Sequence, residues 1–107
     1  MIQQLLEKLD SKTIQFKDVL AYIEDNYTYT VSAFQNGTQY NAENENQGSG
    51  RVFAFAQSQG LSKEDTLKLF AEHYDAVLNN PEGTDHQNIR QFMRNGWDGV
   101  KFEIIRN

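Results

Sequence analysis

The spacing of the apolar residues is the feature that most constrains the fold of this chain. In residues 2–9, and again in residues 16–27, apolar side chains recur at intervals of three and four, which places them on one face of an α-helix. Similar stripes predict helices over residues 51–59, over 63–78 as one long helix, and over 85–95. The sequence therefore predicts a mainly α protein, a compact single domain of about five helices that covers residues 1–107.

Polar residues at the predicted boundaries support two of these helices. Ser62 supplies a hydroxyl that can cap the helix beginning at residue 63. Thr84 and Gln87 follow the spacing of a capping box, which predicts that the Thr84 hydroxyl caps the last helix and that Gln87 bonds back to the cap.

Two segments fall outside the predicted helices. Residues 34–50 are expected to form one long ordered loop, with a turn at the Asn-Gly pair of residues 36–37 and a Gly-Ser-Gly end that opens the next helix. Residues 100–104 alternate apolar and polar side chains, which predicts a short extended C-terminal segment. Residues 27–30, rich in Tyr and Thr, are its expected partner.

Charge and composition argue against several functional classes. The chain carries 15 acidic and 10 basic residues, a net charge of −5, and its Lys and Arg are scattered, so nucleic-acid binding is not expected. No apolar run is long enough to cross a bilayer, so no membrane association is expected either. The start of the chain lacks a basic and apolar signal stretch, and there is no cysteine. These features favour a cytoplasmic protein.

The predicted loop over residues 34–50 is rich in groups that recognise polar surfaces. It combines seven side-chain amides with two aromatic residues. This inventory suits binding of a protein partner or a small polar ligand, but the same amides could pin an Ω-type loop to the domain. The residues predicted to contact a ligand are Asn36, Tyr40, Asn41, Glu43, Asn44, Ser49 and Arg51.

The two histidines are the candidates for chemistry, and each follows an acidic residue in the pairs Glu72-His73 and Asp85-His86. His73 lies at the edge of an apolar stripe, which predicts a half-buried imidazole hydrogen-bonded to a neighbour, whereas His86 is expected to be exposed. A small hydrolase could use either histidine with Glu72, Asp75 or Asp85. No serine lies in a G-x-S-x-G elbow, and no spacing is typical of metal ligands, so neither a metal nor a cofactor is expected.

Several segments resemble one protein family. They are FKDVLAYIEDNYTYT, AFQNGTQYNAENENQGSGRVFAFAQ, LFAEHYDAVL and GTDHQNIRQFMRNGWDGVKFE, which together run from Phe16 to Phe102. In these segments the chain resembles the HopJ type III effector family, whose name refers to proteins delivered into host cells by type III secretion. The resemblance brings no catalytic residue with it. The compact helix predicted from Ile2 leaves no separate polar delivery segment, so secretion into a host cell stands as the alternative to a cytoplasmic location.

Two functions from different classes follow. The first is a protein that acts by binding and has no catalytic activity. In that case the loop amides and aromatics should line a concave surface, with both histidines elsewhere. The second is a small hydrolase-type enzyme, which requires the histidines and carboxylates to converge in one cleft. The binding function is the one that the sequence favours.

Overall fold

The first two predicted helices are confirmed in the computed structural model, which describes residues 2–103. Helix α1 (Ile2–Asp10) buries Leu5, Leu6 and Leu9. Helix α2 (Phe16–Asn26) follows after a short connection and buries Val19 and Ile23. In both helices the buried residues are those of the apolar stripe, so burial of that face stabilises them.

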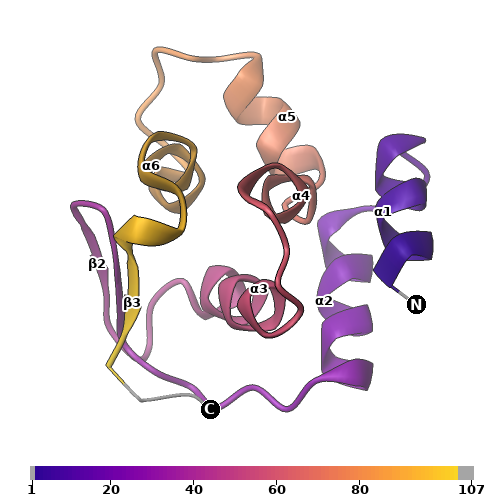
Figure 1. Ribbon diagram of the computed structural model, residues 1–107. Coiled ribbons are helices and arrows are strands. Elements are labelled where there is room, and N and C mark those ends of the chain that lie inside the picture. Colours follow the sequence, from indigo (N-terminus) through magenta and orange to yellow (C-terminus); the bar gives the residue numbers. More distant parts are fainter. Residues whose placement is uncertain (1, 104–107) are drawn as a thin grey trace.

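Four more α-helices, a 3₁₀ turn and three short strands complete the described chain. Their bounds are β1 Phe34–Asn36, β2 Gln39–Asn41, α3 Gln47–Ser58, α4 Lys63–Lys68, α5 Glu72–Leu78, α6 Gln87–Asn95, η1 Gly96–Gly99 and β3 Val100–Phe102. In Figure 1 the sheet lies at one side of the molecule beside α6, and α1 and α2 lie at the other side, with α3 and α4 between them. The mainly α, compact fold is confirmed, with six α-helices.

Aromatic rings form the centre of the hydrophobic core. Phe53 of α3 is fully buried, and its ring lies within 5.0–6.2 Å, between centroids, of the rings of Phe34, Phe70, Phe92 and Trp97. These partners belong to β1, the residues after α4, α6 and η1. One side chain therefore joins four parts of the chain that are far apart in sequence.

The segment predicted as one long loop contains a β-hairpin, which is a correction. Strands β1 and β2 pair antiparallel, with Asn36 opposite Gln39, so Gly37 and Thr38 form a two-residue turn. Gly37 has a φ of 59°, which hairpin turns of this length require and which glycine adopts without strain. The segment also ends earlier than predicted, because residues 48–50 already lie within α3.

The partner predicted for the C-terminal segment is also corrected. Strand β3 pairs antiparallel with β1, not with residues 27–30, and gives a sheet of order β2-β1-β3. The reason is that the hairpin places β1 where its second edge can accept a neighbour. Ile104, the last residue of the alternating pattern, lies outside the described residues.

The long helix predicted over residues 63–78 is wrong, since the chain breaks between α4 and α5. At the break, Ala71 has φ 52° and ψ −124°, a backbone conformation that residues with a Cβ rarely adopt. No glycine or proline marks this point, so tertiary packing outweighs the helix propensity of the sequence. The break leaves Leu78 half exposed, although the stripe predicted it as part of the buried face.

Replacing Ala71 with glycine is expected to stabilise the protein by about 1 kcal/mol, because glycine adopts this conformation without the Cβ clash. Urea unfolding monitored by circular dichroism measures the change. The matched control is Ala76→Gly, at an exposed position inside α5, where the same substitution should destabilise by about 1 kcal/mol. Loss of stability in both variants would contradict the strain assigned to Ala71.

The capping box predicted at Thr84 is absent as well. Helix α6 begins at Gln87 with His86 as its N-cap residue, and the Gln87 side chain donates from Nε2 to Thr84 O at 2.7 Å. Arg90 accounts for the later start, because Nε donates to Asp85 O and Nη1 to Pro81 O, which holds residues 81–85 as a loop.

Candidate functional site

The two histidines lie against each other, and both line one cavity. The centroids of the His73 and His86 rings are 5.1 Å apart, and their planes are tilted by 35°. The cavity has a volume of about 210 Å³ and is called here the histidine pocket. It is lined by Phe16, Asn46, Ser49, Phe70, His73, His86, Gln87, Asn88 and Ile89.

The beginnings of three helices meet at the histidine pocket. Asn46 is the N-cap residue of α3, His86 is the N-cap residue of α6, and His73 lies in the first turn of α5. Among the described residues, neither Asn46 nor His86 caps its helix through its side chain, so these two side chains do not satisfy the first N–H groups of α3 and α6. Both cap residues have left-handed backbone conformations, with φ of 51° and 52°. A left-handed residue before a helix directs successive N–H groups toward one concavity.

His73 is positioned by ring packing. Its imidazole meets the edge of the Phe16 ring, with centroids 5.0 Å apart, and Phe70 and Ile89 supply the apolar wall beside it. The half-buried position of His73 is as predicted. The predicted hydrogen bond is not found, because within residues 2–103 neither ring nitrogen of His73 bonds to a protein group.

The acidic residues next to the histidines are engaged by other groups. Glu72 Oε1 accepts a hydrogen bond from Phe16 N at 2.7 Å. Asp85 accepts from Arg90 Nη2 at 2.7 Å, and this hydrogen bond holds the pKa of Asp85 below its ordinary value. Asp85 Oδ2 lies 3.9 Å from His86 Nε2, too far for a hydrogen bond. The two histidines thus meet in the histidine pocket, whereas Glu72 and Asp85 do not line it, and neither carboxylate orients an imidazole.

Two residues predicted to contact a ligand are instead fully buried. Asn36 and Asn41 form a cluster of amides with Asn88, called here the asparagine cluster. Asn88 Oδ1 accepts from Asn36 Nδ2 at 3.0 Å and from Asn41 Nδ2 at 3.2 Å, and Asn88 Nδ2 donates to Asn41 Oδ1 at 2.8 Å. Asn36 Nδ2 also donates to Asn88 O at 2.8 Å. Their hydrogen bonds tie the hairpin to α6.

The cluster also reaches the histidine pocket. Asn46 Nδ2 donates to Asn41 Oδ1 at 2.8 Å, and Asn46 and Asn88 both line the pocket. Asn36 Oδ1 is the one buried side-chain oxygen or nitrogen without a partner in residues 2–103. Asn36 and Asn41 therefore do not line the pocket themselves. They support its wall by bonding to Asn88, and Asn41 also bonds to Asn46.

The other predicted contact residues are spread over the surface. Tyr40 is half exposed and donates from its hydroxyl to Glu103 Oε2 at 3.1 Å, a bond that raises the pKa of Tyr40. Glu43 and Asn44 are exposed, and the Arg51 guanidinium lies over the Tyr29 ring at 5.3 Å. Of the seven residues predicted to contact a ligand, Ser49 is the one that lines the histidine pocket.

Sequence reasoning did not single out Asn46, Gln87 or Asn88 as members of a site with the histidines. Asn46 falls inside the segment predicted as a loop, and the capping-box spacing of Thr84 and Gln87 placed the start of the last helix too early. The signal that could have found the start of α3 is Asn46 itself, because asparagine is a common N-cap residue.

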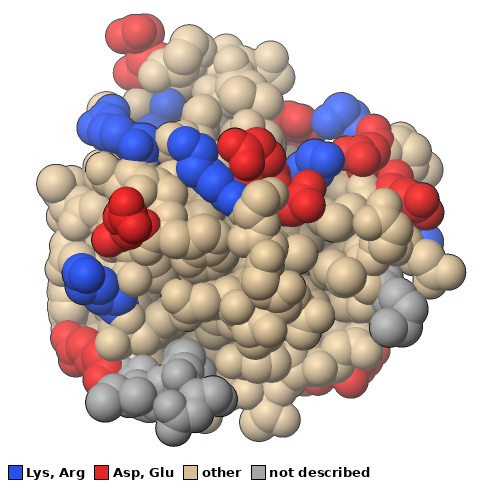
Figure 2. All heavy atoms as spheres, viewed as in Figure 1, with Lys and Arg blue, Asp and Glu red and all other residues tan. Residues whose placement is uncertain are grey.

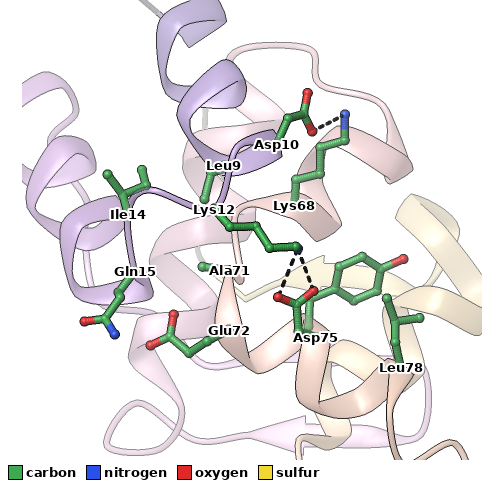
Figure 3. Close-up of a pocket in the computed structure, with 11 residues that line it drawn as sticks. Leu9, Asp10, Lys12, Ile14, Gln15, Lys68, Ala71, Glu72, Asp75 and Leu78 are labelled. Carbon is green, nitrogen blue, oxygen red and sulfur yellow. Dashed lines mark hydrogen bonds and ion pairs between the residues drawn. The ribbon is translucent and has the colours of Figure 1, made fainter.

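A second cavity, of about 390 Å³, lies between α1, the connection to α2, and α5 (Figure 3). Four of its charged side chains form two ion pairs: Lys12 Nζ contacts Asp75 Oδ2 at 3.1 Å, and Lys68 Nζ contacts Asp10 Oδ1 at 3.2 Å, whereas Glu72 accepts from Phe16 N. The bond to Asp10 raises the pKa of Lys68. Asp75, a candidate partner of the histidines, is thus bound to Lys12.

The part of the chain that the structure describes holds neither a cluster of metal ligands nor a membrane-spanning helix. In residues 2–103, no group of three or more His, Cys, Asp or Glu side chains is arranged to hold a metal ion. None of the helices there is both long enough and apolar enough to cross a bilayer.

Comparison with known proteins adds a family and one related structure. Residues 2–105 match the model of the family described as HopJ type III effector protein. A solved structure titled as that of the "unknown function protein VPA0580" is 48% identical, with a TM-score of 0.86, and the match covers 97% of this chain and 89% of the other. No curated protein matches this chain.

Proposed function

The chain belongs to the HopJ type III effector protein family, and from that premise we propose that it acts by binding a small anionic ligand in the histidine pocket. The ligand carries a phosphate or carboxylate group, which the imidazoles of His73 and His86 and the first N–H groups of α3 and α6 contact. The protein itself supplies no catalytic group.

The observation that carries this proposal is the convergence of donors on one small cavity. Helix beginnings attract anions because their N–H groups lack partners and the helix dipole is positive there. Two imidazoles 5.1 Å apart add donors whose charge increases on protonation. A cavity of about 210 Å³ is smaller than the ~300–1,000 Å³ of sites for drug-sized ligands, so it suits a single small anionic group.

The arrangement of the carboxylates favours binding over catalysis. A histidine that acts as a general base usually has a hydrogen-bonded partner that orients it. Glu72 is bound to Phe16 N and Asp85 to Arg90, so neither takes that role. The meeting of both histidines with the Ser49 hydroxyl keeps a hydrolase as the second candidate.

Titration with inorganic phosphate, followed by NMR, tests the proposal. The chain has two histidines, so its imidazole signals can be assigned by substitution. Phosphate should shift both imidazole signals and the amide signals of Gln87 and Asn88. His73→Gln and His86→Gln should each weaken binding about tenfold, because each removes a charge-assisted donor.

The control for this titration is Lys101→Gln, which removes a positive charge at an exposed position of β3 outside the pocket. It should bind phosphate as the parent protein does. Equal affinity of the His73→Gln and parent proteins, or no shift at either imidazole, would rule the pocket out. Turnover of a phosphate ester that disappears in His73→Gln or His86→Gln would instead support the hydrolase.

For location, we propose the cytoplasm, with delivery into a host cell as the alternative that the family's description raises. A tagged chain followed in cells with and without a working type III apparatus separates the two. Appearance of the chain outside the cell only when the apparatus works would overturn the cytoplasmic proposal.

A further inference from the structure

A third cavity, larger than the histidine pocket, lies between α5 and α6 beneath the loop that joins them. It has a volume of about 570 Å³ and is called here the arginine cavity. It is lined by Val77, Leu78, Pro81, Gly83, Thr84, Gln87, Arg90, Met93 and Arg94.

The lining of this cavity is basic although the protein is acidic overall, and the charge of one of its two arginines, Arg90, is balanced by Asp85. Among the described residues, its lining holds two arginines and no aspartate or glutamate, although the chain carries a net charge of −5. Figure 2 shows basic side chains gathered over α6 on this face of the molecule. An anion that approaches a protein of net negative charge is therefore attracted locally to this cavity.

The two arginines differ in what holds them. The side chain of Arg90 is only 10% exposed, and it is fixed by its ion pair with Asp85 and by the carbonyls of Pro81 and Asp85. Arg94 is exposed, and within residues 2–103 it forms no ion pair. Arg94 can therefore turn its guanidinium to an incoming anionic group without breaking an existing pair.

The remaining wall of the cavity is apolar. Val77 is buried, Leu78 is 50% exposed, and Pro81 and Met93 add further carbon surface. A half-exposed leucine beside a methionine provides surface that an apolar group can cover. The volume of about 570 Å³ falls within the ~300–1,000 Å³ of small-molecule sites.

We infer that the arginine cavity binds a small organic anion that has an apolar body and one anionic end, with Arg94 pairing the anionic end and Leu78 covering the apolar body. This site is separate from the histidine pocket. Gln87 lines both cavities, and its bond to Thr84 O holds it as a wall between them. The inference therefore does not depend on the function proposed for the histidine pocket.

Three probes separate the two parts of the recognition: octanoate has both parts, octanol lacks the charge, and acetate lacks the apolar body. Titration followed by amide NMR signals of residues 77–94 should show binding of octanoate that is at least about tenfold tighter than that of octanol or acetate. Equal binding of octanol would show an apolar cavity alone, and equal binding of acetate a charge alone; either overturns the inference.

Substitutions complete the test. Arg94→Gln should weaken octanoate binding about fivefold, and Leu78→Gln should do the same, since both side chains are exposed and their loss leaves the core intact. Lys101→Gln, with the same change of charge elsewhere, should leave octanoate binding unchanged. Unchanged affinity in both Arg94→Gln and Leu78→Gln would refute the site. Phosphate binding in the histidine pocket should be the same in all three variants.

Discussion

Phe53→Ala should lower the free energy of unfolding by about 4 kcal/mol, the largest effect expected of any single substitution described here. The truncation removes a fully buried ring that contacts Phe34, Phe70, Phe92 and Trp97, and these side chains belong to different elements that cannot all close the space. A loss of this size is a large part of the ~5–15 kcal/mol that stabilises an ordinary domain. Urea unfolding, followed by tryptophan fluorescence and circular dichroism, measures it.

The matched control for Phe53→Ala is Tyr40→Ala, which also truncates an aromatic residue. Tyr40 is half exposed, and its hydroxyl bonds to the exposed Glu103, so the loss should stay below about 1 kcal/mol. Similar losses in the two variants would show that Phe53 does not join the elements as its ring contacts indicate. Non-coincident fluorescence and circular dichroism transitions would mean that the variant no longer unfolds in two states.

Asn88→Ala is expected to destabilise the protein by about 3 kcal/mol, the second largest effect. It removes three buried hydrogen bonds that Asn88 makes with Asn36 and Asn41, and it leaves amide groups of the hairpin without partners in the interior. Thermal and urea unfolding without added ligand measure the change. The result also shows how strongly the hairpin is held to α6.

The control for Asn88→Ala is Asn44→Ala, in the exposed segment after the hairpin. That substitution should change the free energy of unfolding by less than about 0.5 kcal/mol. Should Asn88→Ala be equally mild, the asparagine cluster would not be what fixes the hairpin. Hydrogen exchange of residues 34–41 gives a second reading, since those amides should exchange faster in Asn88→Ala and at the parent rate in Asn44→Ala.

Helices α1 and α2 were predictable because the burial of one apolar face is enough to determine where they form. The stripes in α1 and α2 repeat over two or three turns, so their period is clear in the sequence. The break at Ala71 was not predictable, because alanine is the best helix former and nothing local signals a turn. That conformation is imposed by contacts between segments far apart in the chain.

The hairpin was missed for a different reason. Strands β1 and β2 have three residues each, too few for an alternating pattern to stand out, whereas the alternation over residues 100–104 did predict the extended segment that forms β3. The Asn-Gly pair did signal a turn, but the pairing depends on Asn36 and Asn41 bonding to Asn88, some 50 residues later. Polar residues in a predicted loop thus proved to be buried in the structure.

The candidate site was predictable only in its parts. The sequence singled out His73, His86 and Ser49 separately, two of them for chemistry and one for binding. Their meeting in the histidine pocket depends on the position of α5 relative to α6, which follows from the break at Ala71 and from Arg90 holding the loop between the helices. Neither cause has a local signature in the sequence.

Because β3 completes the strand order β2-β1-β3, the sheet of a newly made chain cannot be completed until late in its synthesis. Strands β1 and β2 are synthesised some 50 residues before Asn88, which bonds to both of them, and some 60 residues before β3. At roughly 5–20 residues per second, the ribosome needs about 3–12 s to make those residues. During those seconds one edge of β1 has no neighbour and can pair with a strand of another nascent chain. Misassembly of this protein is therefore a hazard of its synthesis, and a chaperone that covers residues 34–36 at that stage would suppress it.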